Sequence, residues 1–344
     1  MADDVMRFDL PWLTERAQRW AAQRTFGAND LPDARDVAAR KRSSGDRVSV
    51  VLPALDEEAT VGDICGSIVT ELIDGVGLVD ELLVIDGGSS DRTATVARAA
   101  GAKVVPISDV MSEVPPVRGK GESLWRSLSI ATGDIICWID ADIRNFRPHF
   151  VTRLITPLLL DTDVSFSKAF YRRPIATGDR LEPQGGGRVT ELLARPLLNA
   201  LFPELSGMLQ PLSGEYAGRR EILESVPFFT GYSVEVGLLI DLVARTGLDA
   251  MVQVDLDERV HRNRPLSELT PMAYAIARTI MQRAEEHGRL RSVLDHASLP
   301  LLLPTEAGDA VQSRDVVEFE RPPLAMIRES VRILRSGDDA VAAL

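Results

Sequence analysis

The chain has 344 residues, 45% hydrophobic and 26% charged, an ordinary globular balance that allows one large domain or two smaller ones. Its 39 basic and 51 acidic residues give a net charge of −12, which repels nucleic acid and anionic membranes at long range. No apolar run approaches the roughly 18 residues of a membrane span, and acidic residues interrupt the N-terminal stretch where a signal peptide needs an apolar core. We expect a cytoplasmic protein that binds neither nucleic acid nor membrane, and an anionic substrate would need locally concentrated arginine.

The sequence pattern divides the chain into four segments, at residues 1–45, 46–145, 146–300 and 301–344. The first is expected to be a helical arm on the outside of the protein. Its apolar side chains form one stripe, which is expected to dock on the protein's own surface: Trp12, Leu13, Ala17 and Trp20. From the second segment on, strand and helix patterns alternate.

Four apolar runs are predicted to be strands, at 48–52, 82–85, 104–105 and 135–139, with helices between them at 57–73, 91–100 and 122–131. This alternation predicts an α/β fold with a doubly wound parallel sheet. Ligands of such sheets bind beyond the carboxyl ends of the strands. Pro53, Asp86 and Asp140 mark that edge.

Two carboxylates follow the fourth predicted strand, in Asp140-Ala141-Asp142. If the chain stays extended there, residues two positions apart point the same way. Mg²⁺ and Mn²⁺ bind through one or two carboxylates and fill their other positions with phosphate oxygens and water. The pattern indicates a metal-diphosphate site, although Asp-x-Asp alone is more often a solvated turn.

Several other catalytic motifs are absent from the sequence. No Gly-x-Gly-x-x-Gly follows the first strand and no Gly-Lys-Ser/Thr loop is present, which argues against NAD-binding Rossmann proteins and P-loop NTPases. The remaining class is a nucleotide-binding sheet that handles phosphate through carboxylates and a metal. Nucleotide-sugar transferases fit this class best, and cytidylyl-type nucleotidyltransferases are the nearest alternative.

The two cysteines carry no predicted chemistry. Cys65 and Cys137 both fall inside apolar patterns. Such cysteines are usually small buried hydrophobic residues, so neither a disulfide nor a zinc pair is expected.

Several motifs resemble known enzymes. Three segments resemble the opening, second-strand and metal motifs of the type A glycosyltransferases, at 48–58, 84–93 and 140–142. Five further segments closely resemble the glucosyl-3-phosphoglycerate synthase family, at 119–127, 170–174, 185–191, 210–216 and 261–265. The sister mannosyl-3-phosphoglycerate synthases share many of these motifs.

The resemblance implies a type A glycosyltransferase fold: a doubly wound, mostly parallel sheet whose first half, 46–145, binds the nucleotide sugar and whose half at 146–300 binds the acceptor. It implies transfer of a hexose from a nucleoside diphosphate sugar to the 2-hydroxyl of 3-phosphoglycerate, with retention at the anomeric carbon. UDP-glucose is favoured over GDP-mannose as donor. A homodimer is also implied, with helices at 272–294 and 322–334 as candidates for the contact.

The resemblance assigns the donor site residue by residue. The residues matched to donor contacts are Pro53, Ala54, Leu55 and Glu57 around base and ribose, Asp86 and Gly87 at the pyrimidine, Lys120 at the diphosphate, and Asp140 and Ala141. A departure occurs at Gly87, where the synthases usually have serine. Glycine leaves room beside the base and makes the choice between uridine and guanosine less certain.

The resemblance also supplies the metal and catalytic residues. Asp142 and His261 would hold Mg²⁺ or Mn²⁺, and an imidazole ligand suits Mn²⁺ at least as well as Mg²⁺. The catalytic group would comprise Asp140, Asp142, Leu212 in the 210–216 motif, and Glu235. We expect Glu235 to bind a sugar hydroxyl rather than to act as a nucleophile.

The acceptor loop is expected at 185–190. Glycines such as Gly187 let backbone N–H groups approach a phosphate, Arg188 can clamp it through two parallel hydrogen bonds, and Thr190 starts a helix whose dipole favours an anion. With Arg259 and Asn263, these residues would supply the local positive field that the acidic chain otherwise lacks.

Overall fold

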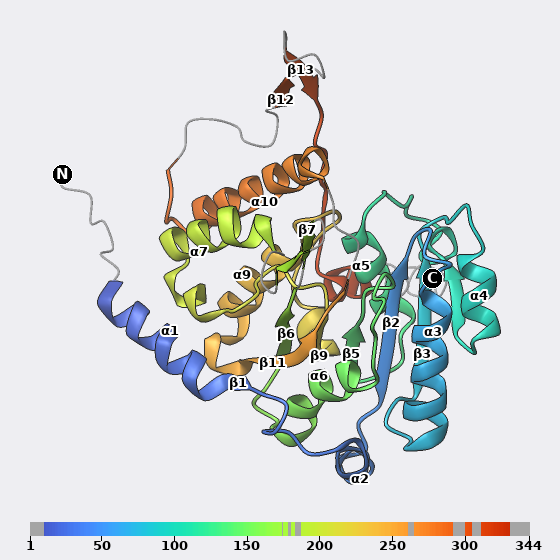
Figure 1. Cartoon of the computed structure of the whole chain (residues 1–344). Helices are drawn as coiled ribbons and strands as arrows, with labels where there is room; N and C mark the ends of the chain where they lie inside the picture. The colour runs from blue at the N-terminus through green and yellow to red at the C-terminus, as the bar shows by residue number, and fades with distance from the viewer. Residues whose placement is uncertain are drawn as a thin grey trace, which may run out of the picture.

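An eight-stranded sheet forms the centre of the computed structural model (Figure 1), which describes residues 10–173, 175–177, 180–182, 187–260, 265–291, 300–304 and 311–330. The strand order is β1-β11-β6-β9-β5-β2-β3-β4. In chain order the strands are β1 Thr25–Phe26, β2 Val48–Ala54, β3 Glu81–Asp86, β4 Lys103–Pro106, β5 Ile135–Trp138, β6 Phe166–Arg172, β9 Tyr216–Arg219 and β11 Met251–Glu258. Only β9 runs antiparallel to its neighbours, β5 and β6. The mostly parallel, doubly wound sheet is therefore confirmed.

The four predicted strands are β2, β3, β4 and β5, and they lie side by side in the sheet. Their side chains alternate between two cores: Val50 and Leu52 belong to one, and Val51 to the other. In β5 both Ile136 and Cys137 are fully buried, on opposite faces. Continuous apolar runs arise because helices cover both faces of the sheet.

Helices form a layer on each face of the sheet (Figure 1). One core contains side chains from α2 Ala34–Ser44, α3 Val61–Ser67, α4 Thr93–Ala99 and α6 His149–Leu160. The other contains side chains from α1 Leu10–Arg24, α5 Lys120–Ile130, α7 Arg195–Leu201, α9 Val234–Thr246 and α10 Leu266–Glu286. Cys65 and Cys137 are buried and free, as predicted.

The predicted helix at 57–73 begins later, at Val61, and continues after α3 as a π-helix, Ile68–Gly75. The preceding residues form a turn, in which Asp56 has a left-handed φ of 58° and the Glu57 amide donates to Thr93 Oγ1 at 2.7 Å. The predicted helix at 91–100 begins at Thr93 because the Asp91 carboxylate accepts from the Thr93 amide, at 2.8 Å. Both helix starts are thus delayed by side-chain contacts that periodicity does not reveal.

The N-terminal arm docks on the protein's own surface, as expected. Leu13, Ala17 and Trp20 are buried, and the Trp20 indole donates to the Met251 carbonyl at 2.9 Å. Trp12 does not belong to the buried stripe: it is 51% exposed. The arm also adds β1 to the edge of the sheet, in parallel with β11.

The C-terminal elements extend from the sheet on the side of α10. This helix spans Leu266–Glu286, so the predicted helix at 272–294 starts earlier and has ended before residue 287. The hairpin of β12 Leu301–Pro304 and β13 Val311–Arg314 projects from the body on the same side as α10 (Figure 1). A second small sheet joins β10 Phe228–Phe229 to β14 Glu320–Arg321.

Residues 324–330 are helical, and the remainder of the predicted helix at 322–334 lies outside the described residues. Among the helices the structure describes, none has the length and apolarity to cross a membrane.

Candidate active site

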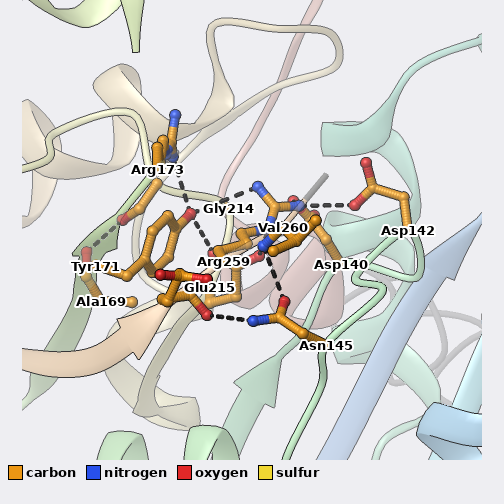
Figure 2. Close-up of polar contacts among 12 residues, drawn as sticks. Asp140, Asp142, Asn145, Ala169, Tyr171, Arg173, Gly214, Glu215, Arg259 and Val260 are labelled. Atoms are coloured by element: carbon orange, nitrogen blue, oxygen red, sulfur yellow. Dashed lines mark hydrogen bonds and ion pairs between the residues drawn. The ribbon is translucent and has the colours of Figure 1, made fainter. Parts of the chain in front are cut away.

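The carboxyl ends of β2, β3 and β5 meet at one edge of the sheet, where Ala54 pairs with Asp86. The two carboxylates of the Asp-x-Asp motif converge there on the guanidinium of Arg259 (Figure 2): Nη2 lies 2.8 Å from Asp140 Oδ2 and 2.6 Å from Asp142 Oδ1. The prediction that both carboxylates face one point is confirmed, although the strand itself ends at Trp138 and the motif lies in the turn that follows.

Arg259 reaches this point from the end of β11, beyond an irregularity in the strand register between Asp255 and Glu258. It is 5% exposed, and its Nε lies 3.1 Å from Glu215 Oε1. Burial alone would lower the pKa of Arg259, but the carboxylates around it, Glu215 foremost, outweigh burial and raise it. The guanidinium is therefore a permanent cation held by three carboxylates.

Two carboxylates converging on one cationic atom are suited to a divalent ion. The third expected ligand, His261, lies outside the described residues, as does Asn263. Within the described parts of the chain, no cluster of three or more His, Cys, Asp or Glu side chains is placed to hold a metal. The geometry of Asp140 and Asp142 fits the predicted metal site, and in this structure the Arg259 guanidinium pairs with both carboxylates.

Lys120 is the first residue of α5 and points into the same cluster. Its Nζ lies 2.5 Å from Asp140 Oδ1 and 2.9 Å from Glu235 Oε1. Burial alone would lower the pKa of Lys120, but the carboxylates of Asp140 and Glu235 outweigh burial and raise it. Burial alone would raise the pKa of Asp140, but Lys120 and Arg259 outweigh burial and lower it. Lys120 is therefore a fixed positive charge beside the Asp-x-Asp motif.

The sequence Gly119-Lys120-Gly121 is typical of a flexible turn, but the structure places Lys120 at the start of α5 instead. A Cβ on Gly119 would lie 2.2 Å from the Thr230 carbonyl oxygen, and one on Gly121 would lie 1.9 Å from that of Phe229. The two glycines allow the start of α5 to pack against the backbone of 229–230, which fixes Lys120 in place.

Glu235, in the first turn of α9, is 8% exposed and faces Lys120. Leu212 is half-buried and packs against the core that includes α9. Close by, a Cβ on Gly214 would lie 2.2 Å from Asp140 Oδ2 and 2.6 Å from Lys120 Nζ. Glycine at 214 thus leaves the space in which the Lys120–Asp140 pair forms.

Residues that the sequence did not assign complete the network behind Arg259 (Figure 2). Glu215 is fully buried; its Oε2 accepts from the Tyr171 hydroxyl at 2.6 Å, and Arg173 donates to the same hydroxyl at 2.8 Å. Burial raises the pKa of Glu215, although Arg259 opposes the shift. These residues lie in the family motifs at 170–174 and 210–216, but nothing in the sequence indicates that Glu215 is buried.

Lys168, on β6, is also unassigned by the sequence. It is 1% exposed, donates to the Ser213 carbonyl at 2.6 Å and lies over the Tyr216 ring at 4.3 Å. Burial lowers the pKa of Lys168 to about 7. A lysine in this state can lose its proton near neutral pH.

Lys168→Met should therefore change how stability depends on pH. With the folded pKa near 7 and the ordinary value at 10.5, the unfolded chain binds more protons between them, so Lys168 makes stability rise with pH across that window. Urea unfolding of the wild type and Lys168→Met should give free energies whose difference grows with pH there. Lys103→Met, at an exposed position on β4, is the control, and a pH-independent difference for Lys168→Met would contradict the assignment.

The expected donor residues line the ends of β2 and β3. Gly87 N donates to the Ala54 carbonyl at 2.9 Å, and Asp86 Oδ1 accepts from the Ser89 hydroxyl at 2.6 Å. Leu55 is 37% exposed above the same edge. Thr60, at the start of α3, donates to the Ala141 carbonyl at 2.6 Å, which ties this donor edge to the Asp-x-Asp turn. Pro53, Glu57 and Ala141 thus belong to one continuous edge with Asp140.

The expected acceptor loop is described from Gly187 onward. Gly187 has a left-handed φ of 78°, and its carbonyl accepts from the Glu191 amide at 2.9 Å. The chain is helical from residue 188, Thr190 opens a π-helical turn, Thr190–Ala194, and its side chain is buried. Arg188 is half-buried at this helix start, in agreement with the predicted local structure.

The chain is similar to proteins of known function. A model of glycosyl transferase family 2 matches residues 49–225. The chain is 54% identical to glucosyl-3-phosphoglycerate synthase of Mycolicibacterium smegmatis over 72% of this chain and 80% of the relative. It is 41% identical to that of Petrotoga mobilis over 89% of this chain and 95% of the relative.

Solved structures give the same grouping. Mannosyl-3-phosphoglycerate synthase from Rubrobacter xylanophilus superposes with a TM-score of 0.82 at 41% identity, covering 90% of this chain and 98% of that one. Glucosyl-3-phosphoglycerate synthase from Mycobacterium tuberculosis, solved with Mn²⁺, UDP-glucose and phosphoglyceric acid, gives 0.77 at 45% identity, covering 88% and 98%. The chain therefore belongs to glycosyl transferase family 2 and, within it, to the family of the glucosyl-3-phosphoglycerate synthases.

Proposed function

We propose that this protein transfers glucose from UDP-glucose to the 2-hydroxyl of 3-phosphoglycerate, with retention at the anomeric carbon, and uses Mn²⁺ or Mg²⁺. The observation that carries the proposal is the convergence of Asp140, Asp142 and Lys120 at the carboxyl edge of the sheet, in a chain whose relatives are glucosyl-3-phosphoglycerate synthases. One such relative was solved with Mn²⁺, UDP-glucose and phosphoglyceric acid bound.

In this proposal each charged residue has one task. Asp142 and His261, with Asp140 in the same site, would hold the divalent ion, which when bound would act as a Lewis acid on the leaving diphosphate. Lys120 adds a fixed point charge to the same diphosphate. Arg259, with Arg188 and Thr190, binds the phosphate and carboxylate of the acceptor.

Glu235 is proposed to accept a hydrogen bond from a sugar hydroxyl. It already faces Lys120 at 2.9 Å, and this ion pair holds its carboxylate in one orientation. A carboxylate in such an ion pair is a weaker nucleophile than an unpaired one. This favours front-face departure of the diphosphate, in which the leaving group takes the acceptor proton, over a covalent intermediate on Glu235.

A mannosyl enzyme that uses GDP-mannose is the second candidate, because the Rubrobacter xylanophilus structure belongs to a mannosyl-3-phosphoglycerate synthase. The two sugars differ at the 2-hydroxyl, and a site that binds one epimer leaves a buried polar group unpaired with the other. Values of kcat/KM for UDP-glucose, GDP-glucose and GDP-mannose with 3-phosphoglycerate distinguish the candidates. A higher value for GDP-mannose than for UDP-glucose would assign the chain to the mannosyl enzymes. Release of pyrophosphate from a nucleoside triphosphate would instead indicate a nucleotidyltransferase.

A homodimer and a cytoplasmic location are also part of the proposal. Leu266, at the start of α10, and Met326, in the helical residues 324–330, are 70% and 59% exposed. Both lie in or beside the two helical segments expected at the dimer contact. Exposed apolar side chains there would give that contact an apolar component.

Arg188→Ala tests the acceptor assignment. Loss of a charge-assisted pair to a phosphate should raise the acceptor KM by roughly one to two decades, since such a bond is worth about 1.5–3 kcal/mol. The donor KM should barely change. Initial rates with each substrate varied measure both constants, and Arg98→Ala, on the exposed side of α4, is the control. A raised donor KM with an unchanged acceptor KM would place the loop elsewhere.

A further inference from the structure

Among the described residues, Ser89 is the one that holds the side chain of Asp86, at the end of β3. Ser89 donates twice to Asp86 Oδ1, from its amide at 3.1 Å and from its hydroxyl at 2.6 Å. The same hydroxyl oxygen accepts from the Asp56 amide at 3.0 Å. A hydroxyl has one proton, and the contact from Asp56 occupies its acceptor side. The proton of Ser89 is therefore committed to Asp86.

This contact leaves Asp86 with one oxygen for a ligand. A carboxylate oxygen accepts about two hydrogen bonds, so Ser89 saturates Oδ1. Among the residues that the structure describes, none donates to Asp86 Oδ2 through a contact comparable to those on Oδ1. Asp86 is only 9% exposed, so a base that bound there would have to match this acceptor pattern with little help from water.

We propose that Ser89 is a specificity-determining residue that selects uracil over guanine by occupying one oxygen of Asp86. The inference rests on the proposed function, in which Asp86 faces the base of the donor. Uracil presents a single ring N–H between two carbonyl groups, which one oxygen satisfies. Guanine presents a ring N–H beside an exocyclic amino group, a pair of donors that requires both oxygens of a carboxylate.

Gly87 acts in the opposite direction. A Cβ there would lie 3.4 Å from the Ala54 carbonyl oxygen and 3.7 Å from Leu55 Cβ, so the glycine leaves space that a serine could fill and that a larger base could use. Space alone does not pair the second donor of guanine. Because an unpaired buried donor discriminates more strongly than a change of pocket volume, hydrogen bonding at Asp86 decides the base.

Ser89→Ala tests the inference through a ratio. The variant keeps the backbone donor and frees one acceptor position on Asp86 Oδ1. The ratio of kcat/KM for UDP-glucose to that for GDP-glucose should fall by about tenfold, the size expected for one hydrogen bond to a charged group. The preference for UDP over GDP in binding, taken from dissociation constants measured by calorimetry with Mn²⁺ present, should also fall.

Ser90→Ala is the matched control. Ser90 is adjacent in sequence and also bonds at this loop, but its hydroxyl donates to Asp56 Oδ1, at 3.0 Å, and not to Asp86. Its base ratio should equal that of the wild type. Ser89→Thr and Ser89→Val form a second pair of nearly equal volume: threonine should retain the wild-type ratio and valine should lose it. This pair tests the hydroxyl even if Ser89→Ala is unstable.

The outcomes separate the inference from the function on which it rests. If UDP-glucose is consumed normally but Ser89→Ala and Ser89→Val keep the wild-type base ratio, the role of Ser89 is overturned and the proposed function stands. If the wild type transfers sugar from neither donor, the proposed function fails. The relative affinities for UDP and GDP then still test Ser89, and equal ratios in the wild type and Ser89→Val overturn its role.

Discussion

Asp142→Ala is expected to lower kcat by about three orders of magnitude or more while leaving the protein folded. Asp142 and Asp140 converge on the same guanidinium nitrogen of Arg259. Loss of one of these two carboxylates weakens binding of the metal, whose charge would stabilise the transition state by several kcal/mol. The fold should survive because the Asp142 side chain is 33% exposed and lies in a turn beyond β5. Turnover and thermal unfolding of the same preparation measure both effects.

Chelation provides the matching test on the wild-type protein. Activity should vanish in excess EDTA and return with Mn²⁺ or Mg²⁺. Asp74→Ala, which removes an exposed carboxylate at the end of the π-helix after α3, should leave activity and metal dependence unchanged. Full activity in EDTA would exclude the proposed role of Asp140 and Asp142.

Strands β2, β3 and β5 could be predicted because they are apolar on both faces. Five consecutive apolar residues end in the Asp-x-Asp motif at β5, and all five are fully buried. The antiparallel strand β9 carries no such signal: it spans only Tyr216–Arg219 and includes Gly218 and the partly exposed Arg219. A Cβ on Gly218 would lie 3.0 Å from Leu223 Cδ2, so this glycine reflects tertiary packing that local pattern cannot reveal.

The site likewise contains residues that the sequence predicts and residues that only the fold reveals. Asp140, Asp142 and Lys120 were recognised because short motifs carry them, and the structure brings them together within ion-pairing distance of shared partners. Glu215 lies in the family motif at 210–216, but the sequence predicts no function for it, because a sequence shows neither the burial of a glutamate nor its partners. Tyr171 and Glu215 are 44 residues apart, and only the fold places them in contact.

Glu215→Ala is expected to have the largest effect on stability, lowering the free energy of unfolding by about 3–5 kcal/mol, the range for removing one partner of a buried ion pair. Glu215 is fully buried, with Arg259 on one oxygen and the Tyr171 hydroxyl on the other. Its loss leaves the Tyr171 hydroxyl without its acceptor and the buried Arg259 guanidinium without one of its three carboxylates. Chemical denaturation measures the change.

Glu215→Gln and Glu221→Ala define what that loss means. Glutamine keeps the shape and one acceptor oxygen, so its cost should be smaller than that of alanine. Glu221, on α8 Arg220–Leu223, is exposed, and its replacement should change stability by no more than about 0.5 kcal/mol. Wild-type stability in Glu215→Ala would show that the network behind Arg259 does not support the fold.

Glu215→Ala should also disturb the acceptor side of the site, because Glu215 orients the guanidinium of Arg259.

If the unpaired Tyr171 hydroxyl contributes to the loss of stability, Tyr171→Phe should lower the free energy of unfolding less in the Glu215→Ala protein than in the wild type. In that protein the hydroxyl that the substitution removes no longer has its acceptor. A double-mutant cycle measures this coupling. Strictly additive changes in free energy would mean that Tyr171 and Glu215 stabilise the protein independently, despite the 2.6 Å contact between them.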